Sequence, residues 1–170
     1  MKTLNYVLSI LLRRGISVFA FLIIQVWQLN AQNCSALPNF NVTLNNQTIN
    51  VPTVYPINSW IRITGTVNFN ANVTMSRCTV LMDPGAILNI NNSTFTMTAD
   101  ASGNRSLIFG CGAMWQAIRV NTGAAVVFRN SDIKNGIQGL VFAQGFLPNL
   151  KKKKNCSFSA NSVAITAQNV

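Results

Sequence analysis

The sequence predicts an all-β solenoid, in which short strands wind into stacked coils. Three observations predict it: apolar and polar residues alternate over short runs, turn residues separate these runs, and one turn-strand-corner sequence occurs three times. Asn, which favours turns and left-handed backbone, accounts for 23 of the 170 residues. Beyond residue 31, no window has the helical apolar period of about 3.6 residues.

Residues 1–31 have the layout of a secretory signal peptide. A basic stretch, residues 2–14, precedes the apolar run 16–29, and the small residue Ala31 stands at the expected cleavage point. The apolar run is shorter than the ~20 residues with which a helix spans a bilayer. We therefore expect cleavage before Gln32 rather than an uncleaved membrane anchor.

Two further segments differ in composition. Residues 32–58 are polar and hold three prolines, which predicts an irregular segment or an N-terminal cap. Residues 59–170 hold the alternating runs and are predicted to form the coils. Val170 follows a strand-like run without a polar capping pattern, so we expect the chain to be truncated at its C-terminus. The expected strands include residues 67–69, 73–75, 88–90, 95–97, 107–109, 115–120 and 126–128.

The repeated sequence runs from a glycine through an apolar strand to an Asn-Ser or Asn-Cys corner. The repeat positions are Gly85, Asn92 and Ser93, then Gly123, Asn130 and Ser131, and finally Asn155 and Cys156. We interpret the interval from Gly85 to Gly123 as two coils of about 20 residues each, the lower end of the solenoid range. An antiparallel sandwich also has short strands, but it does not require the same turn and corner three times.

The repeat predicts how the coils stack. Apolar residues such as Leu88, Ile90 and Phe95 are expected to lie above like residues of the next coil and to make a continuous core. Asn tolerates the left-handed backbone of a tight corner, and stacked Asn side chains form amide ladders. We therefore expect Asn at the corners, and buried side chains at Ile90 and Phe128.

Two stretches, residues 110–133 and 155–165, resemble the rungs of secreted bacterial right-handed parallel β-helix proteins; the first begins Gly-Cys-Gly-Ala-Met-Trp-Gln-Ala-Ile-Arg-Val. Residues 31–34, Ala-Gln-Asn-Cys, are similar to a segment that precedes such rungs. The resemblance covers about residues 60–170. It implies a single-stranded right-handed parallel β-helix that is secreted or located on the outer cell surface. Relatives are usually longer and often end in a sorting domain for type IX secretion, so we expect the N-terminal part of such a cargo protein.

The chain is strongly basic, with 13 Lys and Arg, 3 acidic residues, no His and a net charge of +10. Without His, neither a histidine base nor a Ser-His-Asp arrangement is possible within this sequence. Four of the charges form the run Lys151–Lys154, which we interpret as a solvated loop rather than a basic face. We expect no nucleic-acid partner, and membrane contact only through the signal segment during export.

Four Cys follow the predicted cleavage point: Cys34, Cys78, Cys111 and Cys156. An even count in an exported protein permits disulfides, with three full connectivities. The sequence does not choose between these pairings and unpaired buried thiols. The spacing is unlike that of paired C-x-x-C zinc ligands.

The candidate chemistry of the chain is sparse. Asp83, Asp100 and Asp132 stand at different points of the repeat, so we expect no catalytic residue, metal site or cofactor. A run of alternating Thr residues at 94, 96 and 98 is not kept at the corresponding positions of the second repeat, so we expect no threonine face.

Four residues are candidates for contact with an extracellular polysaccharide or another cell-surface component: Trp115, Arg119, Arg129 and Lys134. Trp stacks on sugar rings, and the three basic residues alternate outward along the expected strands. A packed Trp and a solvated basic face are the competing interpretations.

These observations predict a non-catalytic secreted or cell-surface scaffold, a rigid stalk that serves adhesion or glycan binding. The alternative is the N-terminal fragment of a β-helix polysaccharide lyase or glycoside hydrolase whose catalytic coils lie beyond this sequence. Fold resemblance does not decide between the two functions.

Overall fold

The structure is a computed structural model that describes residues 37, 39–143 and 150–167. Of residues 150–154 and 167, only the backbone is described. The predicted signal peptide, residues 1–31, lies outside the described residues.

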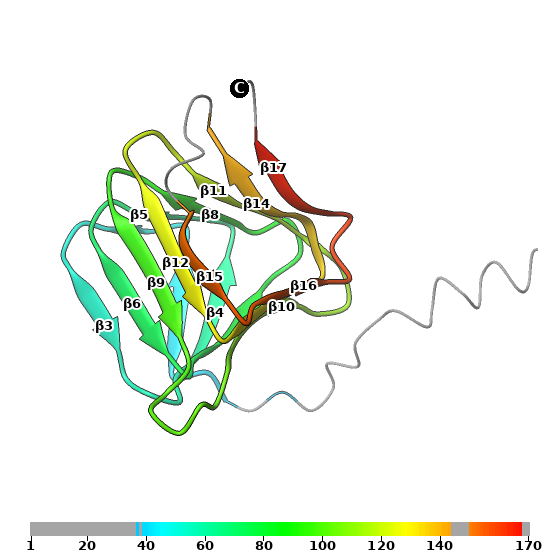
Figure 1. The fold of residues 1–170 in the computed structure, drawn as a ribbon. Coiled ribbons are helices and arrows are strands. Elements are labelled where there is room, and N and C mark those ends of the chain that lie inside the picture. The colour runs from blue at the N-terminus through cyan, green and yellow to red at the C-terminus, as the bar shows by residue number, and fades with distance from the viewer. Residues whose placement is uncertain (1–36, 38, 144–149, 168–170) are drawn as a thin grey trace, which may run out of the picture. The chain divides into compact units, whose positions relative to one another are not determined.

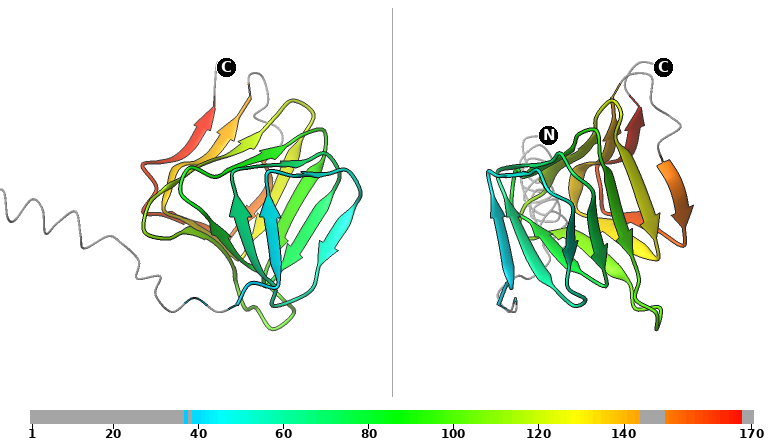
Figure 2. Two further views of the ribbon diagram at one scale, coloured as in Figure 1. Left: turned by 180° about the vertical axis from the view of Figure 1, so that it is seen from behind. Right: turned by 90° about the vertical axis from the view of Figure 1, so that its left-hand side faces the viewer.

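Seventeen strands of the described residues form three sheets around a common axis (Figure 1; Figure 2). Sheet A consists of β1 (Val42–Asn45), β4 (Trp60–Thr64), β7 (Thr79–Met82), β10 (Ser106–Gly110), β13 (Ser131–Lys134) and β16 (Ser157–Ser159). Sheet B consists of β2 (Thr48–Ile49), β5 (Thr66–Phe69), β8 (Ile87–Ile90), β11 (Trp115–Val120), β14 (Gly136–Phe142) and β17 (Val163–Ala167). Sheet C consists of β3 (Thr53–Tyr55), β6 (Val73–Ser76), β9 (Thr94–Thr98), β12 (Ala125–Arg129) and β15 (Leu150–Lys154).

Consecutive strands belong to sheets A, B and C in turn, so three strands make one coil. Each strand pairs in parallel with the strand three places further along the chain, as β4 does with β7 and β5 with β8. The result is a parallel β-solenoid of about 5 turns, which confirms the predicted fold class. We number the coils 1 to 5 by their sheet A strands, β1, β4, β7, β10 and β13.

The solenoid begins earlier in the chain than the sequence predicts. β1, β2 and β3 form a whole coil within residues 32–58, which were predicted to be irregular. Pro52 and Pro56 stand directly before and after β3, at corners where a proline removes no ladder hydrogen bond. The first alternative, an irregular segment, is therefore wrong from Val42 onward, because its prolines mark corners.

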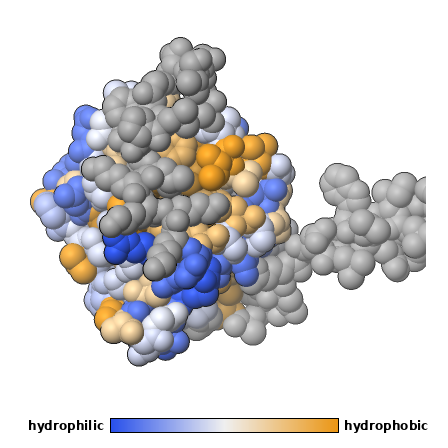
Figure 3. All heavy atoms as spheres, viewed as in Figure 1, coloured by the Kyte–Doolittle hydropathy of each residue, from blue (hydrophilic) through white to orange (hydrophobic). Residues whose placement is uncertain are grey.

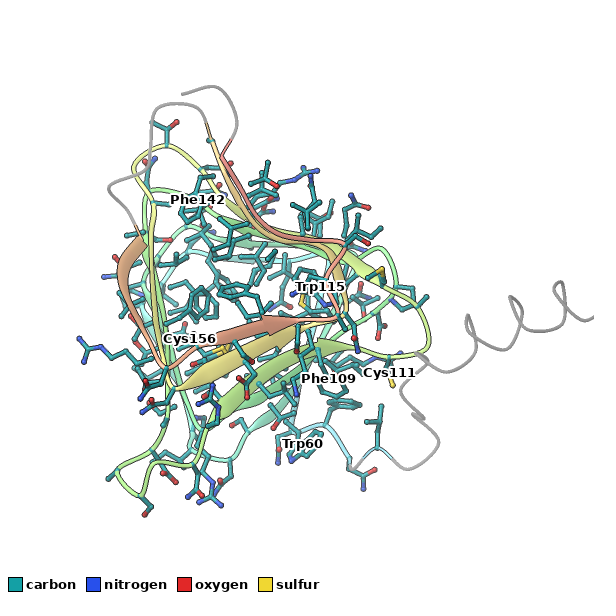
Figure 4. All side chains as sticks on the ribbon, turned by 45° about the vertical axis from the view of Figure 1, so that its right-hand side comes forward. Trp60, Phe109, Cys111, Trp115, Phe142 and Cys156 are labelled. Carbon is teal, nitrogen blue, oxygen red and sulfur yellow. The ribbon has the colours of Figure 1, made fainter. Side chains whose placement is uncertain are left out.

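The core is the interior of the solenoid, and side chains from all three sheets fill it (Figure 4). Ile90 and Phe128 are fully buried, as predicted. Phe69, Phe95 and Phe128 pack edge to face, with ring centroids 5.5 Å apart in the first pair and 5.8 Å apart in the second. Apolar residues of neighbouring coils thus lie on one another and form the continuous core that the repeat predicted.

The interval between the first two repeats does not correspond to two coils. Leu88 in β8 pairs with Ile118 in β11, whereas Val126, which takes the place of Leu88 in the second repeat, lies in β12 and pairs with Phe95. The shift from Gly85 to Gly123 therefore moves the chain by one coil and one further sheet. Coil lengths also vary: Thr79 is the partner both of Trp60 in the coil before it and of Leu107, much further away in sequence, in the coil after it.

The repeated Asn-Ser and Asn-Cys pairs are corner motifs rather than markers of the coil period. Asn92 has φ +45° and turns the chain from sheet B to sheet C, while Asn130 and Asn155, with φ +48° and +51°, turn it from sheet C to sheet A. Ser93 and Ser131 then point inward and are buried. Asn at left-handed corners was predicted correctly, but the same motif serves two different corners.

A ladder of asparagine amides follows the corner after sheet B. Asn70 Nδ2 donates to Asn50 Oδ1 at 3.0 Å, Asn91 Nδ2 to Asn70 Oδ1 at 2.9 Å, and Asn121 Nδ2 to Asn91 Oδ1 at 2.6 Å. The ladder joins four successive coils and confirms the predicted stacking of Asn side chains.

We expect Asn91→Ala to lower the free energy of unfolding by about 1 kcal/mol, because it removes two partly exposed hydrogen bonds of the ladder. Equilibrium unfolding in urea measures the loss. Asn104→Ala is the matched control for bonds within one loop, since Asn104 bonds only to Asp100 of its own loop. A loss for Asn91→Ala below that of Asn104→Ala would contradict a stabilising role of the ladder.

The lysine run is a strand and not a loop. Residues 150–154 form β15, which pairs with β12: Lys152 is the partner of Val127 and Lys154 the partner of Arg129. The predicted solvated loop is therefore wrong. The sequence pattern missed the strand because four equal residues hide any alternation of period two.

Candidate functional site

Each of the three carboxylates is held by an arginine of the preceding coil. Arg62 lies 3.0 Å from Asp83, Arg77 lies 3.1 Å from Asp100, and Arg105 lies 2.6 Å from Asp132. Asp83 also accepts a hydrogen bond from Thr64 Oγ1 at 2.8 Å. These pairs connect neighbouring coils, so the carboxylates have structural partners.

The three carboxylates do not converge on one point. Asp83 follows β7, Asp100 lies in the loop after β9, and Asp132 lies within β13. Among residues 39–143 and 150–167, no group of three or more His, Cys, Asp or Glu side chains is close enough to hold a metal ion.

Asp132 accepts hydrogen bonds from side chains on both sides of its coil, Arg105 before it and Ser157 after it. The Arg105 guanidinium, followed by the Ser157 hydroxyl, holds the pKa of Asp132 below its ordinary value of 3.8, against an opposing effect of burial. Asp132 Oδ2 accepts from Arg105 Nε at 2.9 Å, and Oδ1 accepts from Ser157 Oγ. The ionised form of Asp132 therefore stabilises the contact between coils 4 and 5.

The lowered pKa of Asp132 predicts that the free energy of unfolding falls in acid. The contribution of Asp132 is complete above the ordinary carboxyl pKa and is lost as the pH falls through the folded-state pKa. We expect Asp132→Asn to be destabilised by less than about 1 kcal/mol at pH 7, because Arg105 is solvent-exposed and water screens the pair. Unfolding midpoints from pH 7 to pH 2 should converge for parent and variant. A difference that stays constant down to pH 2 would contradict this role.

The four predicted glycan contacts do not form one site. Arg119 lies exposed on β11 of sheet B, Arg129 lies exposed on β12 of sheet C, and Lys134 lies half-buried on β13 of sheet A. Trp115 is fully buried, and its Nε1 donates to the Lys134 carbonyl at 2.8 Å, so its indole presents no face to a sugar (Figure 4). The three basic residues therefore do not share one sheet face, because consecutive strands of a coil belong to different sheets.

The outer face of sheet C has two rows in which hydroxyl side chains repeat from β6 to β9, and the sequence analysis missed this repetition. The middle row, as we call it, runs through Val54, Thr74, Thr96, Val127 and Lys152 in strand register. The corner row beside it runs through Ser76, Thr98, Arg129 and Lys154. Two members of the Thr run at 94, 96 and 98 thus have hydroxyl partners in the preceding coil. The comparison of the repeats that begin at Gly85 and Gly123 looked only at later residues and did not reveal these partners. The signal that marks it is the Thr-x-Thr-x-Thr run together with Thr74 and Ser76 of the preceding coil.

The outer face of sheet A is partly covered. Leu81 and Phe109 alternate with core residues and lie in register with exposed Arg62, yet both are buried. Phe40 packs edge to face on Trp60 with centroids 6.4 Å apart, and the Arg62 guanidinium lies 6.0 Å from the Phe40 ring. Trp60 and Phe109 are seen on the outside of these strands in Figure 4. At its N-terminal end this face is therefore apolar, and Phe40 packs on it there.

The outer face of sheet B is lined by amides that bond to one another. Asn89 Nδ2 donates to Asn68 Oδ1 at 2.8 Å, and Asn68 Nδ2 donates to Thr48 Oγ1 at 3.4 Å. Arg119 continues this row in coil 4 as the register partner of Asn89. The amides of this row are thus hydrogen-bonded to neighbours in the row, and Arg119 follows them in register.

The described cysteines differ in state. Cys78 is a fully buried free thiol, and burial raises its pKa. Cys111 is disulfide-bonded. Cys34 lies outside the described residues.

No family model matches the chain, and no curated protein and no solved structure matches it. None of the described residues belongs to a helix long and apolar enough to cross a membrane.

Proposed function

We propose that the chain is a non-catalytic scaffold of the secreted or cell-surface type, whose solenoid presents flat strand faces for adhesion to polysaccharide. The observation that carries this proposal is the contrast between the carboxylates and the polar side chains on the outer face of sheet C. All three carboxylates are tied up in ion pairs between coils, whereas the outer rows of sheet C leave hydroxyls and Arg129 at the surface. A rigid face of this kind suits binding without chemistry.

The export that the sequence predicts supports the same proposal. The signal-peptide pattern of residues 1–31, the resemblance to type IX secretion cargo and the even number of later cysteines all favour a secreted or outer-surface location. Mass measurement of the exported protein tests cleavage. An N-terminus at Gln32 is expected, and retention of Met1 would contradict a cleaved signal peptide.

The adhesion function is tested by applying the exported chain to an array of neutral and anionic polysaccharides. We expect retention on at least one class, with no release of reducing ends or of unsaturated sugars. Failure to bind any polysaccharide would overturn the proposal. Release of cleaved sugars would instead favour the alternative, a piece of a polysaccharide lyase or glycoside hydrolase.

A further inference from the structure

We infer that the outer face of sheet C is the binding face, and that its ligand is a linear anionic polysaccharide carrying carboxylate or sulfate groups. The inference rests on the proposed adhesive function and names its surface and its ligand class. Three properties of the face carry it: its openness, its spacing and its charge.

The residues of both rows whose side chains are described are half-buried or exposed. Thr74, Thr96 and Val127 of the middle row are half-buried, as strand residues on a flat sheet are, and Val54 is 76% exposed. Figure 2 shows the strands of this sheet side by side, and in Figure 3 the part of their outer side that is not grey is a mixture of hydrophilic and hydrophobic residues. In contrast, sheet A has buried outward residues at Leu81 and Phe109.

The spacing of the rows fits a repeating polymer. Neighbouring strands of a sheet lie roughly 4.8 Å apart, and alternate residues on one strand lie roughly twice 3.3 Å apart. Thr96 and Thr98 therefore place two hydroxyls along one strand. Thr74 and Ser76 place two more at the same register positions one coil earlier. Ser76 Oγ and Thr98 Oγ1 are 3.1 Å apart, which fixes both hydroxyls of the corner row. A sugar chain that runs along the solenoid axis meets the same two hydroxyl positions in coils 2 and 3.

The charge of the face selects an anionic polymer. The five strands of sheet C contain no acidic residue, but they carry Arg129 and Lys151–Lys154. Each Asp of the described part is paired with Arg62, Arg77 or Arg105, so none neutralises Arg129. Lys152 and Lys154 take the register positions next to Val127 and Arg129. The corner row therefore passes from the hydroxyl of Thr98 to the exposed Arg129 in the next coil.

The same observations disfavour a nucleic acid as the ligand. Unstacked bases are bound on aromatic side chains, and the outward rows of sheet C contain none. Hydroxyls at regular spacing and isolated cations match sugar hydroxyls with intermittent carboxylate or sulfate groups.

Arg129 and Arg119 provide a matched pair of variants for the test. Both are exposed arginines of coil 4, on the consecutive strands β12 and β11, and neither is in an ion pair with an Asp. The full exported chain is titrated with dextran sulfate, polygalacturonate and unmodified dextran. Dextran sulfate and dextran differ only in charge, and polygalacturonate distinguishes carboxylate from sulfate.

We expect the parent to bind at least one polyanion and to ignore dextran. Arg129→Ala should weaken binding by about tenfold, the loss of one charge-assisted hydrogen bond, while Arg119→Ala stays within about twofold. Lys152→Gln with Lys154→Gln should weaken binding further, and Thr96→Val, which keeps the shape but removes the hydroxyl, by about threefold. Unfolding midpoints close to that of the parent confirm that each variant is folded.

Four results would overturn the inference. Equal losses for Arg129→Ala and Arg119→Ala would show that the face is not sheet C. Equal affinity for single-stranded DNA and for the polysaccharides would show general attraction of polyanions. Binding of dextran alone would leave adhesion standing and refute the anionic ligand, whereas binding of no polysaccharide would refute the adhesive function itself.

Discussion

Phe95→Ala is expected to lower the free energy of unfolding by about 3–5 kcal/mol, the usual cost of removing a fully buried aromatic ring. Phe95 is 1% exposed and lies between the rings of Phe69 and Phe128, so its removal breaks both edge-to-face contacts. Its neighbours belong to coils 2 and 4, which means that one substitution loosens coil 3 from both sides. This loss is a large part of the stability of a domain of this size.

Equilibrium unfolding in urea measures the effect, and two variants serve as controls. Phe95→Leu keeps most of the volume and should lose less than Phe95→Ala. Thr96→Ala changes the next residue on the outer side of the same strand and should stay within about 1 kcal/mol. A loss for Phe95→Ala no larger than that for Thr96→Ala would show that the stack of rings does not hold the coils together.

Trp115→Ala is expected to be similarly costly, about 3–5 kcal/mol, because Trp115 fills the corner between sheets A and B. A Cβ atom placed on Gly136 would lie 2.6 Å from Trp115 Cζ2, and one on Gly110 would lie 2.8 Å from Cδ1. The two glycines therefore leave the room that the indole occupies. Removal of the ring also leaves the Lys134 carbonyl without the donor Nε1, which adds to the loss.

The two effects of Trp115 are separated by Trp115→Phe. This variant keeps much of the packing and loses the hydrogen bond to Lys134, so we expect an intermediate loss of about 1–3 kcal/mol. Gln116→Ala on the outward side of β11 is the control and should stay within about 0.5 kcal/mol. An unfolding free energy of Trp115→Ala equal to that of Gln116→Ala would refute the packing role.

The period-two pattern and the Asn corners were sufficient to predict the solenoid, because both depend on local chemistry. Strands such as β10 and β11 were predicted at nearly their observed bounds, and the amide ladder follows from Asn at equivalent positions. The register between coils could not be predicted in the same way. It depends on loop length, and the loops after β9 and β10 lengthen the coils, so a constant repeat fails there.

The error in register explains the errors in the candidate site. Arg119, Arg129 and Lys134 look like one outward series in the sequence, yet each corner between them rotates the chain to another sheet. The Thr rows were overlooked for the same reason, since their partners are found only by pairing β6 with β9. Burial of Trp115 was left open because an aromatic at the start of a strand suits a packed corner and an exposed platform equally well.

The parallel pairing of every coil with the next has a mechanical consequence. Hydrogen bonds between coils, such as those joining β5 to β8 and β8 to β11, point along the axis of the solenoid rather than across it. A tensile force applied along that axis stretches these bonds along their length. Junctions in series carry the same force and break one after another, so the molecule should extend in a series of small steps under an optical trap. A protein anchored to a surface through such a solenoid should therefore respond to a sudden pull by extending in several steps rather than by a single rupture.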